Sequence, residues 1–246
     1  TKQLNPLFTG SFRRIPFLRG VVVLAETLAL GMRALSQSAN VAMGEEQKEL
    51  SPWALLGMLT VSLTLAVTIF FVAPLAASSV FDSLTESSLV SNIAEGIIRL
   101  IILVAYIWGI SLMKDIRRVY AYHGAEHMTV HAHEAGDPLD ISSVRKYSTA
   151  HPRCGTAFLL TVIVLATVIF AMVGRPSLPW MLVSRIALLP LIASISYEII
   201  RFTGAHFHNP LVRILTSPSL ALQALTTRQP DDDQIEVAIH AMNTAL

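Results

Sequence analysis

The sequence predicts an all-α membrane protein, a polytopic helical bundle of about four transmembrane helices with flanking amphipathic helices and a histidine-rich cytoplasmic loop. Of its 246 residues, 53% are hydrophobic and only 14% are charged, whereas a soluble domain carries about 25% charged residues. The mean hydropathy is +0.57. The apolar residues also lie in long uninterrupted stretches. Length, low charge and this clustering together predict the membrane class.

The remaining composition excludes several other classes of protein. Disordered, fibrous and coiled-coil chains need more charge, more Gly and Pro, or a strict repeat. The 18 Lys and Arg against 17 Asp and Glu give a net charge of +1, so we expect no sequence-specific nucleic-acid binding. The single cysteine, Cys154, excludes an internal disulfide framework.

Four stretches are long and apolar enough to span a bilayer core, which needs roughly 20 apolar helical residues. They run from about Trp53 to Ala77, Ile97 to Met113, Thr156 to Val173 and Trp180 to Phe202. The first and third carry no charge. The second contains Arg99, and the fourth contains Arg185, Glu198 and Arg201.

The distribution of Lys and Arg predicts the orientation of these spans. Six precede the first span, none lies in the 78–96 connection, and six lie in the 114–155 connection. We therefore expect a bacterial inner-membrane protein with both termini and the 114–155 loop in the cytoplasm. The first 15 residues lack the apolar core of a cleavable signal peptide. The expected parts are a cytoplasmic segment 1–51, a membrane domain 52–202 and a C-terminal segment 203–246.

Three segments outside the spans have helical patterns. Gly20–Ala39 is apolar but interrupted by charge, which predicts an amphipathic helix at the interface or on the bundle. Thr203–Arg228 contains two prolines and predicts short interfacial helices. The aspartates of Pro230–Asp233 precede a further apolar pattern. We expect them to cap a final helix rather than to bind a metal.

A cluster of histidines in the 114–155 segment is the strongest chemical signal. His123 and His127 are four residues apart, so a helix would place both imidazoles on one face, where they could bind one divalent metal. With Glu126 they form the H-x-x-E-H pattern of inverted zincins, in which the Glu activates a metal-bound water. We interpret His123 and His127 as ligands of a divalent metal, zinc by preference, and Glu126 as the general base. His131 is a further candidate, or an interfacial histidine.

The third ligand is left open by the sequence. Glu198 and His151 are candidates, and Glu198 is an ionisable residue within a span, where such residues face a partner or a cavity. A salt bridge from Glu198 to Arg201 or to Arg99 is equally compatible with the sequence.

The motif His151–Thr156 contains two more candidates. Cys154 has three possible roles, as a nucleophile, a metal ligand or a small packing residue at a helix entrance. Arg153 is placed to stabilise developing negative charge or to orient the loop at an anionic membrane surface.

Several sequence blocks resemble the YqhQ-like family of uncharacterised bacterial membrane proteins, whose members are described as predicted metal-dependent enzymes. The blocks are Leu18–Val21, Tyr122–His127, His151–Thr156, Ser196–Arg201 and Leu225–Asp232. One departure is Ala157, where the family commonly has Ser. The resemblance implies a metal site. Because members are often encoded near translation factors, the resemblance also implies a role with ribosomes or in membrane-protein insertion.

Three functions therefore remain. The first is a membrane-embedded metal-dependent enzyme, hydrolytic in type, acting on a lipid-like or membrane-peptide substrate. The second is a non-catalytic membrane factor associated with the ribosome or translocon. The third is a transporter or channel, which four spans would form only by assembling as a homo-oligomer, and the sequence contains no inverted repeat.

Overall fold

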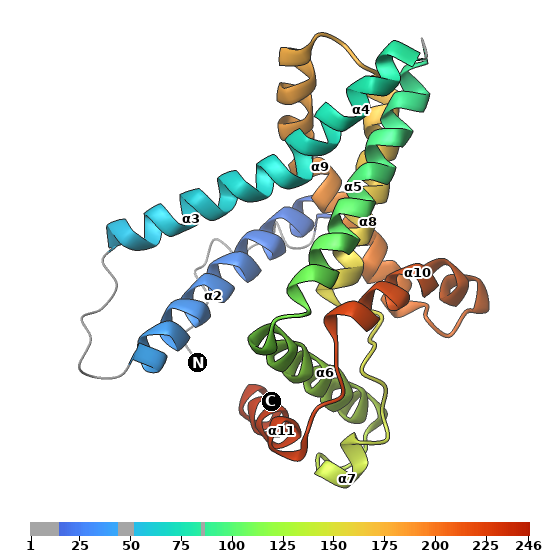
Figure 1. Ribbon diagram of the computed structural model, residues 1–246. Coiled ribbons are helices and arrows are strands. Elements are labelled where there is room, and N and C mark those ends of the chain that lie inside the picture. The colour runs from blue at the N-terminus through green and yellow to red at the C-terminus, as the bar shows by residue number, and fades with distance from the viewer. Residues whose placement is uncertain (1–14, 44–51, 85–86) are drawn as a thin grey trace. The chain divides into compact units, whose positions relative to one another are not determined.

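The computed structural model describes residues 15–43, 52–84 and 87–246, and every regular element in these ranges is a helix (Figure 1). The elements are α2 (Leu18–Met43), α3 (Pro52–Val67), the π-helix η2 (Thr68–Val72), α4 (Ala73–Leu84), α5 (Ser88–Ile110), α6 (Lys114–Ala135), α7 (Ile141–Val144), α8 (Gly155–Val173), α9 (Leu178–Ala205), α10 (Pro210–Thr226) and α11 (Asp232–Ala245). The predicted all-α class is confirmed. Several of the basic residues used to predict the orientation, namely Lys48 and those before Ile15, lie outside the described ranges.

Four helical stretches of the described chain are long and apolar enough to cross a membrane, as the sequence predicts. They are Leu56–Phe81, Ser88–Ile110, Gly155–Val173 and Leu178–Ala205. The second begins at Ser88, before the predicted start at Ile97. The predicted 78–96 connection includes Glu95, which is instead part of this span.

The chain forms two compact units. One contains the described part of residues 1–99 together with Leu165–Glu198, and the other contains Leu100–Val164 and Ile199–Leu246. Helices α5, α8 and α9 each contribute residues to both units. We describe each unit by itself.

A buried charge cluster lies within the first unit. The Glu95 carboxylate, 1% exposed, accepts hydrogen bonds from Arg99 at 2.6 Å and from Arg185. Arg175 reaches the same carboxylate at 3.4 Å. Burying a charge is costly unless it is paired, so Glu95 explains how Arg99 and Arg185 are accommodated inside spans. Arg99 therefore pairs with Glu95, and the alternative of an Arg99–Glu198 salt bridge is wrong.

Pro74 explains a second contact of Arg99. A proline has no N–H to donate to the carbonyl of the residue four positions earlier. That residue is Phe70, in the π-helix η2, and its carbonyl accepts a hydrogen bond from Arg99 Nε at 2.9 Å. The arginine thus satisfies a backbone group within a membrane-spanning helix.

Helix α2 extends beyond the predicted Gly20–Ala39 at both ends. In its first turn, Arg19 donates to the Glu198 carboxylate through Nε at 2.6 Å and also through Nη2. The structure thus joins Glu198 to Arg19, a partner that the sequence analysis does not consider.

The second unit is built around α6, α7 and α11. Its core consists of the fully or almost fully buried Ala125, Met128, Ala132, Val144 and Ile235. Gly136 ends α6 with φ of +76°, a left-handed conformation that glycine adopts without strain. The predicted aspartate cap is also present, because the Asp231 side chain accepts the N–H of Gln234 in a capping box.

Helix α10 differs from its prediction. The sequence predicts short helices interrupted at Pro218, but α10 continues through this residue. Pro218 leaves the Ile214 carbonyl without its usual donor. The hydroxyl of Ser217 donates to that carbonyl at 2.8 Å, so the helix accommodates the proline.

Candidate metal centre

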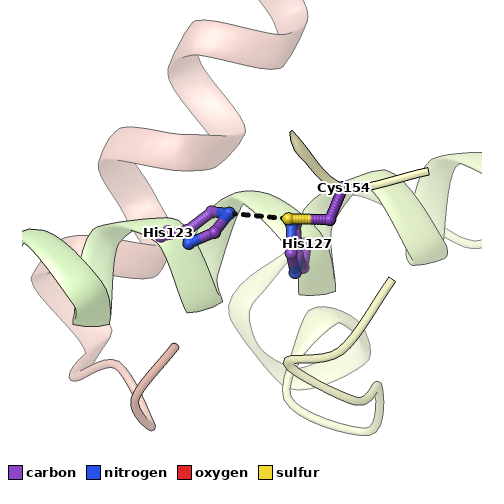
Figure 2. Close-up of side chains that lie close together, drawn as sticks. All are labelled: His123, His127 and Cys154. Atoms are coloured by element: carbon purple, nitrogen blue, oxygen red, sulfur yellow. Dashed lines mark hydrogen bonds between the residues drawn. The ribbon is translucent and has the colours of Figure 1, made fainter. Parts of the chain in front are cut away.

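Helix α6 and the segment before α8 bring two histidines and the cysteine together. His123 and His127 lie one turn apart on α6, with ring centroids separated by 4.3 Å. The Sγ atom of Cys154 lies 3.3 Å from His123 Nε2 (Figure 2). One ligand atom from each of the three residues lies within 4.8 Å of the others.

Backbone carbonyls fix the orientation of both imidazoles. His123 Nδ1 lies 2.9 Å from the Thr226 carbonyl, and His127 Nδ1 lies 2.7 Å from the Thr149 carbonyl. A carbonyl only accepts hydrogen bonds, so each Nδ1 must be the protonated donor. Nε2 of each ring is thereby left to bind another group. Metal-bound histidines usually have this arrangement.

The segments that provide these carbonyls are themselves held in place. Gln223 is completely buried, and its side-chain amide bonds both to the N–H of His151 at 2.8 Å and to its C=O at 2.9 Å. The hydroxyls of Thr156 and Thr226 lie 3.1 Å apart. These contacts join the 149–156 segment to the end of α10, so the surroundings of Cys154 are pre-organised.

The three side chains also favour a thiolate. Burial raises the pKa of Cys154, but hydrogen bonds to His123, His127 and Thr156 together outweigh it and lower that pKa to about 5. The hydrogen bond with Cys154 raises the pKa of His123 more than burial lowers it, and Glu126 adds to this rise. At neutral pH Cys154 is therefore a thiolate beside the His123 ring.

The donor set fits a divalent zinc ion. Zinc prefers thiolate and imidazole ligands at roughly 2.3 Å and 2.0–2.1 Å in tetrahedral geometry, which places a sulfur and a nitrogen about 3.6 Å apart. The observed 3.3 Å between Cys154 Sγ and His123 Nε2 is close to this value. Three protein ligands leave one position of a tetrahedron open, as in catalytic zinc sites.

A second cluster lies beside the first. His131, Glu134 and His151 also place ligand atoms within 4.8 Å of one another, and the rings of His151 and His127 have centroids 5.8 Å apart. Glu134 accepts a hydrogen bond from Arg153 at 2.8 Å and lies 3.3 Å from His151 Nε2. His151 Nδ1 accepts the backbone N–H of Arg153 at 3.2 Å. The second cluster is therefore already a hydrogen-bonded network.

Two further residues that the sequence proposes for the site, Glu126 and Glu198, are not among the three clustered side chains. Glu126 is exposed on α6, next to His127 in sequence. Glu198 belongs to the other unit and pairs with Arg19. The sequence analysis did not identify Thr149, Gln223 or Thr226. Thr149 and Thr226 act through backbone carbonyls, which leave no signature in the sequence. Gln223 bonds to His151, which is 72 residues away, so no local pattern points to it.

The helices and this site define a multi-span α-helical protein of the membrane class with a histidine–cysteine cluster. The chain belongs to the family described as "Protein of unknown function (DUF1385)", which it matches over residues 15–246. It is 30% identical over 249 residues to the uncharacterized protein YqhQ of Bacillus subtilis (strain 168), covering 95% of this chain and 78% of the relative. The predicted family is thus confirmed. No solved structure matches the chain.

Proposed function

We propose that this protein is a metal-dependent membrane enzyme of hydrolytic type, with zinc held by His123, His127 and Cys154. The observation that carries the proposal is the convergence of two imidazoles and a thiol, with both rings oriented by carbonyls. When bound, the ion would supply a Lewis acid. We prefer this cluster to the one at His131, because the groups of the latter are hydrogen-bonded to one another and to Arg153.

The surrounding residues have separate roles in this proposal. Glu126 is exposed, and its charge acts on the His123 ring. In this proposal it serves as the general base of the H-x-x-E-H pattern. Thr226 and Thr149 hold the two imidazoles in the tautomer that leaves Nε2 available. Arg153, which is anchored on Glu134, supplies a positive charge beside the cluster.

Metal analysis of the purified full chain tests the proposal. We expect about one zinc per chain in the wild type, and little in His123→Ala or in Cys154→Ser, which preserves side-chain size. His133→Ala is the matched control, because His133 is exposed at the end of the same helix. Thermal unfolding of each variant separates loss of the ion from loss of the fold. Wild-type zinc content in His123→Ala would refute the proposal.

Glu126→Gln distinguishes a base from a ligand. As a base, Glu126 does not coordinate the ion, so this variant is expected to keep the wild-type zinc content. Loss of zinc in Glu126→Gln, with an unchanged melting temperature, would instead make Glu126 a ligand. The measurement requires no knowledge of the substrate.

A further inference from the structure

A cleft of about 600 Å³ lies in the second unit, and its lining includes Tyr122, the residue before His123 on α6. It is formed by the first turns of α6, the connection between α10 and α11, and the start of α11. Three arginines line it, namely Arg117, Arg118 and Arg228. All three are exposed, so the cleft presents guanidinium groups to a ligand from outside.

The cleft and the metal centre share the same short segment. Thr226, whose carbonyl holds the His123 ring, precedes Arg228 by two residues. The Arg228 N–H donates to the Tyr120 carbonyl at 2.9 Å. The Arg228 carbonyl packs so closely on α6 that a Cβ at Gly124 would lie 2.1 Å from it. The chain that orients a candidate ligand therefore also places an arginine in the cleft.

The charges in the cleft favour an anion. Its three arginines outnumber its two acidic lining residues, Asp231 and Asp233, and Asp231 caps α11 through the N–H of Gln234 at 2.9 Å. The Arg228 side chain forms no hydrogen bond or ion pair with the residues that the structure describes. Guanidinium groups match the geometry of phosphate oxygens through paired N–H donors, so a phosphate group suits this lining.

Arg117 ties the cleft to the end of a membrane span. Its Nε donates to the carbonyl of Ser111 at 3.1 Å, and Ser111 follows directly after α5. The end of a span is the depth at which phospholipid phosphates lie, and basic residues there attract anionic lipids. The cleft is therefore accessible both to a lipid headgroup and to a soluble phosphate compound.

We propose that this cleft binds the phosphate group of the substrate that reaches the metal centre. This inference rests on the proposed function, because it assigns the cleft as the part of that site that selects the substrate. Arg118 and Arg228 would contact the phosphate, while Arg117 fixes the cleft against the end of α5. The substrate class is thereby a phosphorylated compound, such as a phospholipid.

Calorimetric titration of the purified full chain in detergent tests this proposal. The probes are short-chain phosphatidic acid, short-chain phosphatidylcholine and inorganic phosphate. We expect phosphatidic acid to bind about tenfold more weakly to the Arg118→Gln/Arg228→Gln variant. Arg213→Gln is the matched control, because Arg213 is an exposed arginine on α10 away from this lining. Competition by inorganic phosphate would assign a soluble source, and its absence a lipid headgroup.

Two further measurements separate this proposal from the proposed function. The arginine variant is expected to keep its zinc and its melting temperature. If Cys154→Ser loses zinc but still binds phosphatidic acid through the arginines, the phosphate site stands independently of the metal. If no zinc is bound by the wild type while arginine-dependent binding persists, the proposed function fails alone. Unchanged affinity in the arginine variant would overturn the cleft assignment.

Discussion

The properties of Cys154 depend on residues that are distant in sequence. Its own neighbours, His151 to Thr156, are compatible with a nucleophile, a ligand or a packing residue. The fold selects between these roles by placing His123 and His127 beside the thiol. A thiol that is already a thiolate at neutral pH binds a metal without first losing a proton. The surroundings of Cys154 therefore support the proposed role of a metal ligand.

The thiolate can be tested in metal-free protein. The pKa of Cys154 is lowered to about 5, against about 8.5 for an ordinary cysteine. The thiolate therefore forms above pH of about 5 and is lost as the pH falls through that value. We expect the ultraviolet absorbance difference between wild type and Cys154→Ser to change near pH 5. His123→Ala should move this change to higher pH, and a wild-type inflection near pH 8.5 would contradict the prediction.

At the scale of elements, the sequence predicts helices well where one pattern extends over many residues. The four spans and α11 follow from apolar length and from a capping signal, both of which are local. The continuity of α10 was not predicted, because Ser217 compensates for Pro218 through one hydrogen bond that a proline count does not reveal. Likewise, Glu95 is accommodated in its span by Arg99, one turn along the same helix, and by the distant Arg185.

The same distinction applies to the candidate site. The spacing of His123 and His127 on one helix is a local property and could be predicted. Cys154 is contributed by another segment, and its approach depends on Gln223, which lies 72 residues from His151. Without an indication that these segments meet, the sequence left Cys154, His151 and Glu198 as competing candidates. The long-range contacts bring Cys154 to the two histidines, which the local pattern could not show.

The variant Gln223→Ala tests whether Gln223 holds the 149–154 segment against α10. Replacement of Gln223 by alanine leaves the N–H of His151 without its buried partner, and an unsatisfied group costs roughly 1–3 kcal/mol. The His151 carbonyl loses one of its two donors and keeps the N–H of Cys154 at 3.3 Å. We expect Gln223→Ala to lower the melting temperature and the zinc content, because the 149–154 segment is released from α10. Gln229→Ala is the control, since Gln229 is exposed. Normal zinc content in Gln223→Ala would show that the segment is held by other contacts.

At the scale of the whole molecule, the number of spans constrains the side on which each segment lies. If all four stretches cross the membrane, the segment after the second and the segment after the fourth lie on the same side. These segments contain α6 and α11, which pack together around Met128 and Ile235. The candidate metal centre combines the same two parts, with ligands from 123–154 and a carbonyl from Thr226. The packing is thus consistent with an even number of crossings.

The orientation itself is a prediction from the Lys and Arg bias. Because Cys154 is the only cysteine, Cys154→Ser provides a background without thiols. In that background we expect Thr244→Cys and Ser142→Cys to be protected from a membrane-impermeant maleimide in intact cells. Ser177→Cys, in the connection between α8 and α9, should be labelled. All three should react after the membrane is made permeable.

Each outcome of the labelling distinguishes a different error. Labelling of Thr244→Cys and Ser142→Cys with protection of Ser177→Cys would reverse the orientation and place the site on the outer face. Labelling of Thr244→Cys alone would imply an odd number of crossings between it and Ser142, which the packing of α6 on α11 does not permit. The predicted pattern keeps the metal centre and the arginine cleft on the cytoplasmic side, where phosphorylated soluble compounds and the anionic inner leaflet are both within reach.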